Sequence, residues 1–373
     1  MGCFFRKDMK KIIKLIKNDI LLTIAGVLAL ISCFFVPPDI NFADYINLPV
    51  LVLLFCLMIV VAGVRRAGVF EFLKANLSKM VRTEKTMVLM LCMICFFASA
   101  LITNDVALIT FVPFSLMILK NQKPSCIVFA VVMETIAANL GSLITPVGNP
   151  QNLYLYTHYN MNIAEFFKIT TPLGAVCLAM ILVCLILRKN TYLSSENQQN
   201  GVTLKKGAVA IFSGLFILCI LSVLKIISCY ITFVVVVIAT VIYDRKLLRE
   251  ADYILLVTFV FFFVFAGNVA RIPVIYDFIV SAMSGREVLM SALISQVVSN
   301  VPAAAMLSAF TDDAKSLILG TNIGGLGTVI ASMASLISYR FIAKEESISK
   351  GRYMLTFTAY NVGMLSILLV IFS

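Results

Sequence analysis

The chain of 373 residues is poor in charge and lacks most of the side chains that enzymes use for catalysis. Charged residues make up 13% of it, histidine occurs once and tryptophan is absent. No nucleophilic triad or phosphate-binding glycine loop is visible, and the polar stretches are too short for a catalytic domain. We therefore expect a protein that is not an enzyme and that has no cofactor, apart from a bound sodium ion.

Apolar sequence takes the place of charge. Hydrophobic residues make up 61% of the chain, more than a soluble protein of this length could bury. Many of them fall in runs long enough to cross about 30 Å of hydrocarbon. The ten cysteines are scattered, mostly in these runs, and are read as small core residues. The composition predicts an all-α polytopic membrane protein, whose surroundings are the lipid bilayer and not nucleic acid.

Nine apolar runs are predicted to span the membrane. They lie near residues 19–36, 48–64, 125–153, 170–187, 207–226, 229–243, 253–269, 314–338 and 353–372. Two further apolar segments, 86–119 and 287–310, are interrupted by polar residues, so each could be a pair of full spans or a re-entrant hairpin. The 14 residues after Asp105 reach roughly 21 Å, which is short of the hydrocarbon core. We favour two hairpins whose tips end inside the membrane.

The distribution of lysine and arginine predicts the orientation. Of the 30 basic residues, 25 fall in one set of alternate loops, and the opposite loops hold only Lys168, Lys225, Arg271, Arg286 and Lys315. Because basic loops stay in the cytoplasm, the N-terminus is expected inside and, after nine spans, the C-terminus outside the cell membrane. The formal net charge of +11 is then explained by a cytoplasmic rim that faces anionic lipid.

The order of elements repeats in the second half with inverted direction. Each half contains two spans, a short stretch (69–80 or 272–283), an interrupted segment, a span with polar residues and a last span. With an offset of 183 residues, six positions are identical, namely Asn139/Asn322, Gly141/Gly324, Leu143/Leu326, Thr145/Thr328, Leu153/Leu336 and Tyr156/Tyr339. The prediction is a first repeat at 1–187, a linker with a connecting span at 188–228 that begins with the polar stretch 189–206, and a second repeat at 229–373.

The stretch "ANLGSLITPVGNPQNLYLY" (138–156) predicts a helix that is broken inside the membrane. Pro146 and Pro150 prevent a continuous helix and leave backbone carbonyls without partners. Unwound backbone is costly in lipid unless it is buried in protein or lines a cavity. Two broken helices at matching places in inverted repeats therefore indicate a binding site where the halves meet.

Two asparagines and two acids are the candidate functional side chains. Asn104 and Asn300 stand at the predicted hairpin tips and could bind a cation, a solute or both, although asparagine also favours caps and turns. Asp105 and Glu134 are acids at membrane depth, where a carboxylate is by default a functional candidate, and structural pairing is the alternative. The single histidine, His158, is expected on the surface of an outer loop.

The motifs "ITPVGNPQN" and "SNVPAAAML" resemble the ion transporter superfamily. Its members include divalent anion/sodium symporters, citrate and arsenite permeases, and sodium/proton antiporters of similar fold. The resemblance implies a homodimer in which a transport part, built from hairpins and broken helices, moves like an elevator against a scaffold.

The resemblance also implies binding residues. One cation site would use Thr103, Asn104 and the backbone near Gly141 and Ser142. The other would use Ser299, Asn300 and the backbone near Gly324 and Gly325. The residues expected at the solute are Asn104, Thr145, Pro146, Asn149, Asn300 and Thr328.

The hairpin tips depart from the pattern of the dicarboxylate symporters. Those proteins carry Ser-Asn-Thr at both tips, whereas this chain has Thr-Asn-Asp and Ser-Asn-Val. An acid beside an anionic solute argues against a dicarboxylate and in favour of proton coupling. The leading hypothesis is an ion-coupled transporter, using sodium or protons, for a small anionic or oxyanionic solute. A cation/proton antiporter that uses Asp105 and Glu134 is the alternative. A channel is the hypothesis from a different functional class.

Overall fold

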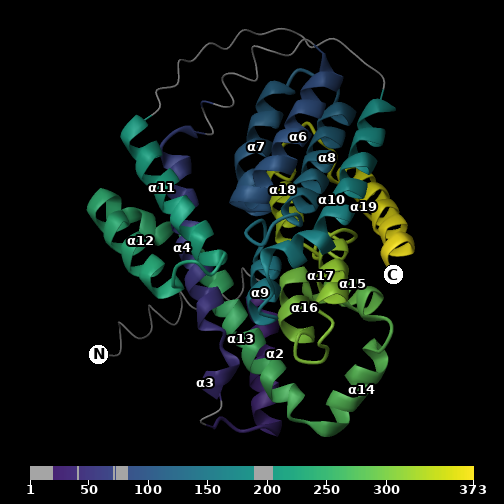
Figure 1. The fold of residues 1–373 in the computed structure, drawn as a ribbon. Coiled ribbons are helices and arrows are strands. Elements are labelled where there is room, and N and C mark those ends of the chain that lie inside the picture. The colour runs from purple at the N-terminus through teal and green to yellow at the C-terminus, as the bar shows by residue number, and fades with distance from the viewer. Residues whose placement is uncertain (1–19, 40–41, 70–71, 73–82, 189–204) are drawn as a thin grey trace, which may run out of the picture.

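A computed structural model describes residues 20–39, 42–69, 72, 83–188 and 205–373 (Figure 1). The N-terminal basic segment, most of the short stretch 69–80 and the linker residues 189–204 lie outside the described residues. The first half contains α2 (Ile20–Phe35), α3 (Phe42–Tyr45), α4 (Leu48–Arg66), α6 (Glu84–Ile102), α7 (Asn104–Ile118), α8 (Pro124–Ser142), α9 (Pro150–His158) and α10 (Ile163–Ile186).

The second half follows α11 (Lys206–Val223) and repeats this order. It contains α12 (Cys229–Asp244), the 3-10 helix η1 (Arg245–Glu250), α13 (Tyr253–Ala270), α14 (Pro273–Met283), α15 (Glu287–Val298), α16 (Asn300–Leu307), α17 (Ala314–Ile323), α18 (Met333–Ile342) and α19 (Lys350–Phe372). Seven of the described helices are long and apolar enough to cross a membrane. The prediction of an all-α polytopic membrane protein is confirmed.

Both predicted helix breaks are present. Between α8 and α9 the chain turns, and α9 restarts at Pro150 with the side chain of Asn149 accepting from the backbone N–H of Asn152 at 2.9 Å. Proline suits this first helical position because its missing N–H would have had no helical partner. The second break, between α17 and α18, is longer and contains Gly327 at φ +101°, a backbone conformation that favours glycine.

Each interrupted segment is a pair of helices that meet at one strained residue. Thr103 joins α6 to α7 with φ 74° and ψ 147°, and Ser299 joins α15 to α16 with φ 76° and ψ 154°. Such a backbone conformation costs a non-glycine residue about 1–3 kcal/mol, and strain of this kind clusters at functional sites. Its recurrence at both tips indicates that the two pairs are built to the same plan.

Helix lengths bear on the choice between hairpins and pairs of spans. The 12 residues of α15 and the 8 residues of α16 extend about 18 Å and 12 Å, too short to cross the hydrocarbon core. For the second segment these lengths favour a hairpin. In the first segment α6 has 19 residues, long enough for a span, while α7 has 15. The depth of both tips in the membrane stays a prediction.

The packing of the helices follows a pseudo-two-fold relation between the halves. Helix α7 packs on α18 while its counterpart α16 packs on α9, and α2 packs on α13 while α12 packs on α4. Thr135 of α8 donates to Ser338 of α18 at 2.7 Å, and Asn139 of α8 donates to Ser335 at 3.4 Å. Along this contact the residue numbers increase in α8 while they decrease in α18, so the two broken helices run antiparallel. This is the inverted arrangement of a repeat.

The helices enclose two hydrophobic cores. One lies among α6, α7, α8, α10, α18 and α19, and the other among α2, α4, α11 and α13 with α9 and α16 against them. In Figure 1 α4, α11 and α12 lie on one side, and α6, α7, α8 and α10 on the other. Helix α9, which follows the first break, packs on α4, and α16, which follows the second tip, packs on α13, so the candidate site lies where the two cores meet.

Candidate functional site

Each hairpin tip is tied to the broken helix of its own half by one backbone hydrogen bond. The N–H of Asn104 donates to the carbonyl of Gly148 at 3.3 Å, and the N–H of Asn300 donates to the carbonyl of Ala331 at 2.9 Å. Gly148 and Ala331 are related by the same offset of 183 residues that relates the two motifs. The bond satisfies an N–H at a helix start that has no partner within its own helix.

Two of the predicted cation-site residues, Gly141 and Gly324, are places of close helix contact. A Cβ atom on Gly141 would lie 2.0 Å from the backbone oxygen of Phe96 in α6. A Cβ atom on Gly324 would lie 2.8 Å from the Cα atom of Ala292 in α15. The first limb of each hairpin thus packs directly on its broken helix, and glycine is required for that packing whether or not its carbonyl binds a cation.

Asn139 of α8 connects the first tip to the second half. Its side-chain oxygen accepts from Asn104 Nδ2 at 3.0 Å and from Ser332 Oγ at 2.9 Å. Its amide nitrogen donates to Ser335 Oγ at 3.4 Å. Asn104, Asn139, Ser332 and Ser335 are all buried. The orientation of the Asn104 amide is therefore set by residues of both halves.

Asn322 of α17, the counterpart of Asn139, connects the second half to the first broken helix. Its side-chain oxygen accepts from Asn149 Nδ2 at 3.1 Å, and its amide nitrogen donates to Asn152 Oδ1 at 2.6 Å. An offset of 183 relates Asn149 to Ser332 and Asn152 to Ser335, so the same cross-contacts occur twice. The sequence analysis used Asn139 and Asn322 only as evidence for the repeat. Their identity across the halves was the signal that they belong to the site.

The predicted solute residues Thr145 and Thr328 hold the unwound turns in place. Thr145 Oγ1 donates to the carbonyl of Ala100, and Thr328 Oγ1 donates to the carbonyl of Gln296 at 3.0 Å. Pro146 is buried beside the first of these residues, and Thr328 is exposed. Ser142 Oγ donates to the carbonyl of Asn139 at 2.8 Å. The hydroxyls thus have backbone partners in this structure, and their contact with a solute stays a prediction.

Two polar groups at the tips lack partners among the described residues. The amide nitrogen of Asn300 donates to nothing, although Asn300 is only 4% exposed. The carboxylate of half-buried Asp105 accepts no hydrogen bond and pairs with no cation, and Asp252 at the start of α13 repels it. The unpartnered donor of Asn300 is suited to binding a solute. The unpaired acid Asp105 is suited to binding a cation or a proton.

Glu134 lies apart from the tips, in the core formed by α6, α7 and α8. Its Oε1 atom accepts from Ser115 Oγ at 2.5 Å, and its Oε2 atom has no partner within the described residues. Ser115 is eleven residues beyond Asn104 on α7, or about 16 Å along the helix. Glu134 and Asp105 therefore do not form one two-carboxylate site. Nearby Cys92 and Cys95 are buried free thiols, and no group of three metal-binding side chains occurs in the described part of the chain.

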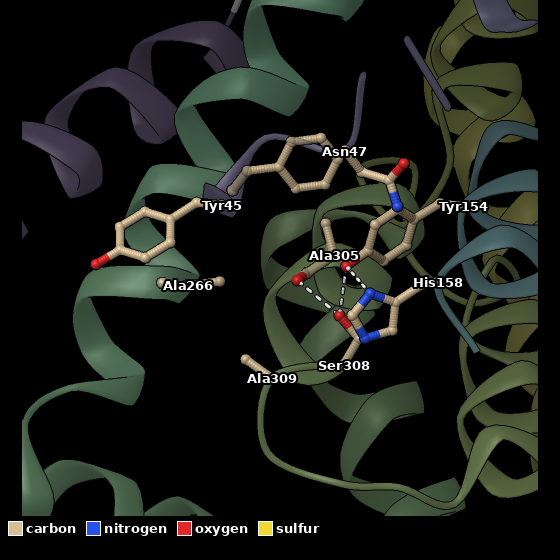
Figure 2. A pocket seen from close by; sticks show the side chains of 10 residues that line it. Tyr45, Asn47, Tyr154, His158, Ala266, Ala305, Ser308 and Ala309 are labelled. Atoms are coloured by element: carbon tan, nitrogen blue, oxygen red, sulfur yellow. Dashed lines mark hydrogen bonds between the residues drawn. The ribbon is translucent and has the colours of Figure 1, made fainter. Parts of the chain in front are cut away.

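A cavity of about 290 Å³ separates α9 and α16 from α13 and the start of α4 (Figure 2). Its polar wall is formed by Tyr154, whose hydroxyl hydrogen-bonds Ser308 Oγ at 2.6 Å and His158 Nδ1 at 3.3 Å. His158 is exposed, as expected from the sequence. The cavity lies on the predicted outer side of the tips, and Tyr154, Phe263 and Ala305 in its lining belong to the core around α2, α4, α11 and α13.

Comparison with known proteins gives a consistent result. The sequence model of a family described as "Citrate transporter" matches residues 9–316. An uncharacterized transporter of Methanocaldococcus jannaschii is 31% identical over 307 residues, which are 81% of this chain and 82% of that protein. The inner membrane protein YbiR of Escherichia coli is 28% identical over 288 residues, 76% of this chain and 77% of that protein. A silicon efflux transporter of Oryza sativa subsp. japonica is 32% identical over 121 residues, 32% of this chain and 25% of that protein.

Proposed function

The chain belongs to the citrate transporter family and is a membrane transporter, and we propose that it couples the passage of a small anionic or oxyanionic solute to an ion. The observation that carries this proposal is the pair of unpartnered groups at the tips. The amide nitrogen of Asn300 donates to no group among the described residues, although the residue is only 4% exposed, so an oxygen of the solute would satisfy it. The solute would then lie between Asn300 and Asn104.

The coupling group in this proposal is Asp105. Its carboxylate stands beside Asn104, has no cation in contact among the described residues and is repelled by Asp252. An acid in that position favours binding of a proton or of a sodium ion. Sites built from oxygen atoms suit hard cations such as sodium, and the side-chain oxygen of Asn104 would contribute to such a site. With the acid neutralised, an anionic solute can approach the tips.

The same proposal includes how the molecule moves. The part containing the hairpins and broken helices would slide as an elevator against α2, α4, α11, α12 and α13 in a homodimer. The sliding surface would run between α9 and α16 on one side and α4 and α13 on the other, where the cavity of about 290 Å³ leaves part of their contact open. The repeats would be 1–187 and 229–373, joined by 188–228.

Transport itself is tested by counterflow in proteoliposomes. Citrate, phosphate, sulfate, arsenite and silicate are first screened for the one that raises the melting temperature of the purified protein, because a ligand stabilises the state that binds it. A carrier then accumulates the labelled form of that solute against excess unlabelled solute, at a rate that changes with pH. Asp105→Asn is expected to remove the pH dependence and leave the melting temperature nearly unchanged. Absence of counterflow would reject a carrier. An unchanged pH profile in the Asp105→Asn variant would reject Asp105 as the coupling group.

The proposed orientation places the loop 312–314 outside and the loop 121–123 in the cytoplasm. In cells, a cysteine introduced at Asp313 should react with a membrane-impermeant maleimide, and one at Gln122 should react only after the membrane is opened. The parent protein without introduced cysteines is the control for its native thiols. Labelling of both positions in intact cells would contradict the inverted direction of the two halves.

A further inference from the structure

The side chain of Gln296 of α15 hydrogen-bonds the unwound turn of the second broken helix at several points. The amide nitrogen of Gln296 donates to the carbonyls of Gly324 at 2.9 Å, Leu326 at 3.0 Å and Ala292 at 3.0 Å. Its side-chain oxygen accepts from the backbone N–H of Thr328 at 2.9 Å. Because a backbone N–H can only donate, the oxygen must face Thr328, and the nitrogen must face the carbonyls.

Three carbonyl oxygens around one atom are also a ligand set for a hard monovalent cation. Carbonyl oxygens replace the hydration shell of such an ion, and unwound backbone inside a membrane supplies them. The same oxygens are satisfied equally by N–H donors, since a buried carbonyl needs a partner of either kind. At this turn the amide nitrogen occupies the position that an ion would take.

Gly327 shows that the backbone is shaped around the Gln296 side chain. A Cβ atom on Gly327 would lie 2.2 Å from Gln296 Oε1, and Gly327 has φ +101°. Any other residue would be strained there and would displace the amide. The space that the Gln296 side chain occupies is thus formed by the backbone of the turn, and the contact is not a chance contact of a flexible side chain.

The first half has no glutamine at the position equivalent to Gln296. Counting back from the tip asparagines, the position that corresponds to Gln296 is Ala100, which has no donor on its side chain. The first turn is instead held by Asn152, whose amide nitrogen donates to the carbonyls of Ser142 at 3.5 Å, Leu143 at 3.1 Å and Thr145 at 3.3 Å, and the carbonyl of Gly141 accepts from the backbone N–H of Ile144 at 3.2 Å. The ligands left for a cation in the first half are the side chains of Asn104 and the unpaired Asp105, and the second tip has Val301 in place of that acid.

We propose that the amide of Gln296 fills the second cation site, so that this transporter takes at most one coupling cation, held in the first half. The proposal rests on the proposed ion coupling and decides its stoichiometry. It also replaces the expectation of a cation at Ser299, Asn300 and the backbone of Gly324 and Gly325 with an internal hydrogen-bond donor at the same turn.

The test measures the melting temperature of the purified full chain in detergent, in sodium chloride against choline chloride at equal ionic strength and without solute. Gln296→Ala leaves the carbonyls open, so its melting temperature in choline should fall by several degrees and be largely restored by sodium. Gln296→Met removes the donor but fills the space, so sodium should not restore it. Wild type should respond to sodium with a Hill coefficient of one or not at all.

Two results would overturn the proposal. One is a wild-type sodium response with a Hill coefficient near two, which stands as a test even where a variant fails to fold. The other is a folded Gln296→Ala protein that sodium restores no more than it restores Gln296→Met. Because no solute is present, a failed counterflow experiment would reject the transport proposal without changing this reading of the sodium response.

Discussion

Gly141→Ala is expected to lower the stability of the protein strongly. The added Cβ would lie 2.0 Å from the backbone oxygen of Phe96 and 2.6 Å from its carbonyl carbon. Backbone atoms cannot rotate away as a side chain can, so α6 and α8 must separate along their contact. Overpacking a core costs typically 1–3 kcal/mol, and we expect at least about 3 kcal/mol here. The measurement is the midpoint of thermal unfolding in detergent.

Gly363→Ala is the matched control for Gly141→Ala. Gly363 lies inside α19, and no heavy atom would come within 4 Å of an added Cβ. Alanine in a helix interior is more favourable than glycine by roughly 0.5–1 kcal/mol, so this variant should melt at the same temperature or slightly higher. Gly324→Ala, with its nearest atoms at 2.8 Å, should fall between the two. Equal melting temperatures for all three variants would contradict the close packing of the hairpins on the broken helices.

The breaks and tips could be predicted because local chemistry determines them. Pro146 and Pro150 cannot continue a helix, and Asn149 is a favourable residue to start one, so the first break was visible in seven residues of sequence. The lengths of apolar runs gave the spans for a similar reason, since the thickness of the bilayer fixes them. Neither prediction needed to know which helices are neighbours.

The partners at the site could not be read in the same way. Asn139 meets Ser332 and Ser335 across nearly 200 residues, and only the antiparallel crossing of α8 and α18 makes them neighbours. The sequence did not indicate a role for Gln296 within an apolar helix, because that role depends on the path of a turn 28 residues later. Glu134 shares a helix with Gly141, and the sequence marked it as a functional candidate only by its depth in the membrane. The structure turns its carboxylate toward Ser115 and away from the tips.

Replacing Asn104 and Asn300 is expected to affect solute binding in both cases but the stability of the solute-free protein in only one. Asn300 has an amide nitrogen without a partner among the described residues, whereas the Asn104 amide donates to buried Asn139. Asn300→Ala should therefore weaken solute binding while the melting temperature of the solute-free protein stays nearly constant. Asn104→Ala should weaken binding and also lower that melting temperature, because it removes a buried hydrogen bond to Asn139, at a cost of about 0.5–1.5 kcal/mol.

The size of the binding effect follows from the hydrogen bond that each variant removes. A bond of this kind is worth about 0.5–1.5 kcal/mol, or more with a charged solute, so each single variant should bind roughly threefold to tenfold more weakly or worse. The double variant should lose less binding free energy than the sum of the two single losses, since both side chains would contact one ligand. Asn121→Ala, in the exposed loop after α7, should bind as wild type does. Titration of the solute selected by thermal shift into each purified variant gives the dissociation constants. Normal binding by Asn300→Ala together with no binding by Asn104→Ala would show that the first half alone holds the solute, since a site shared between the tips requires both variants to weaken it.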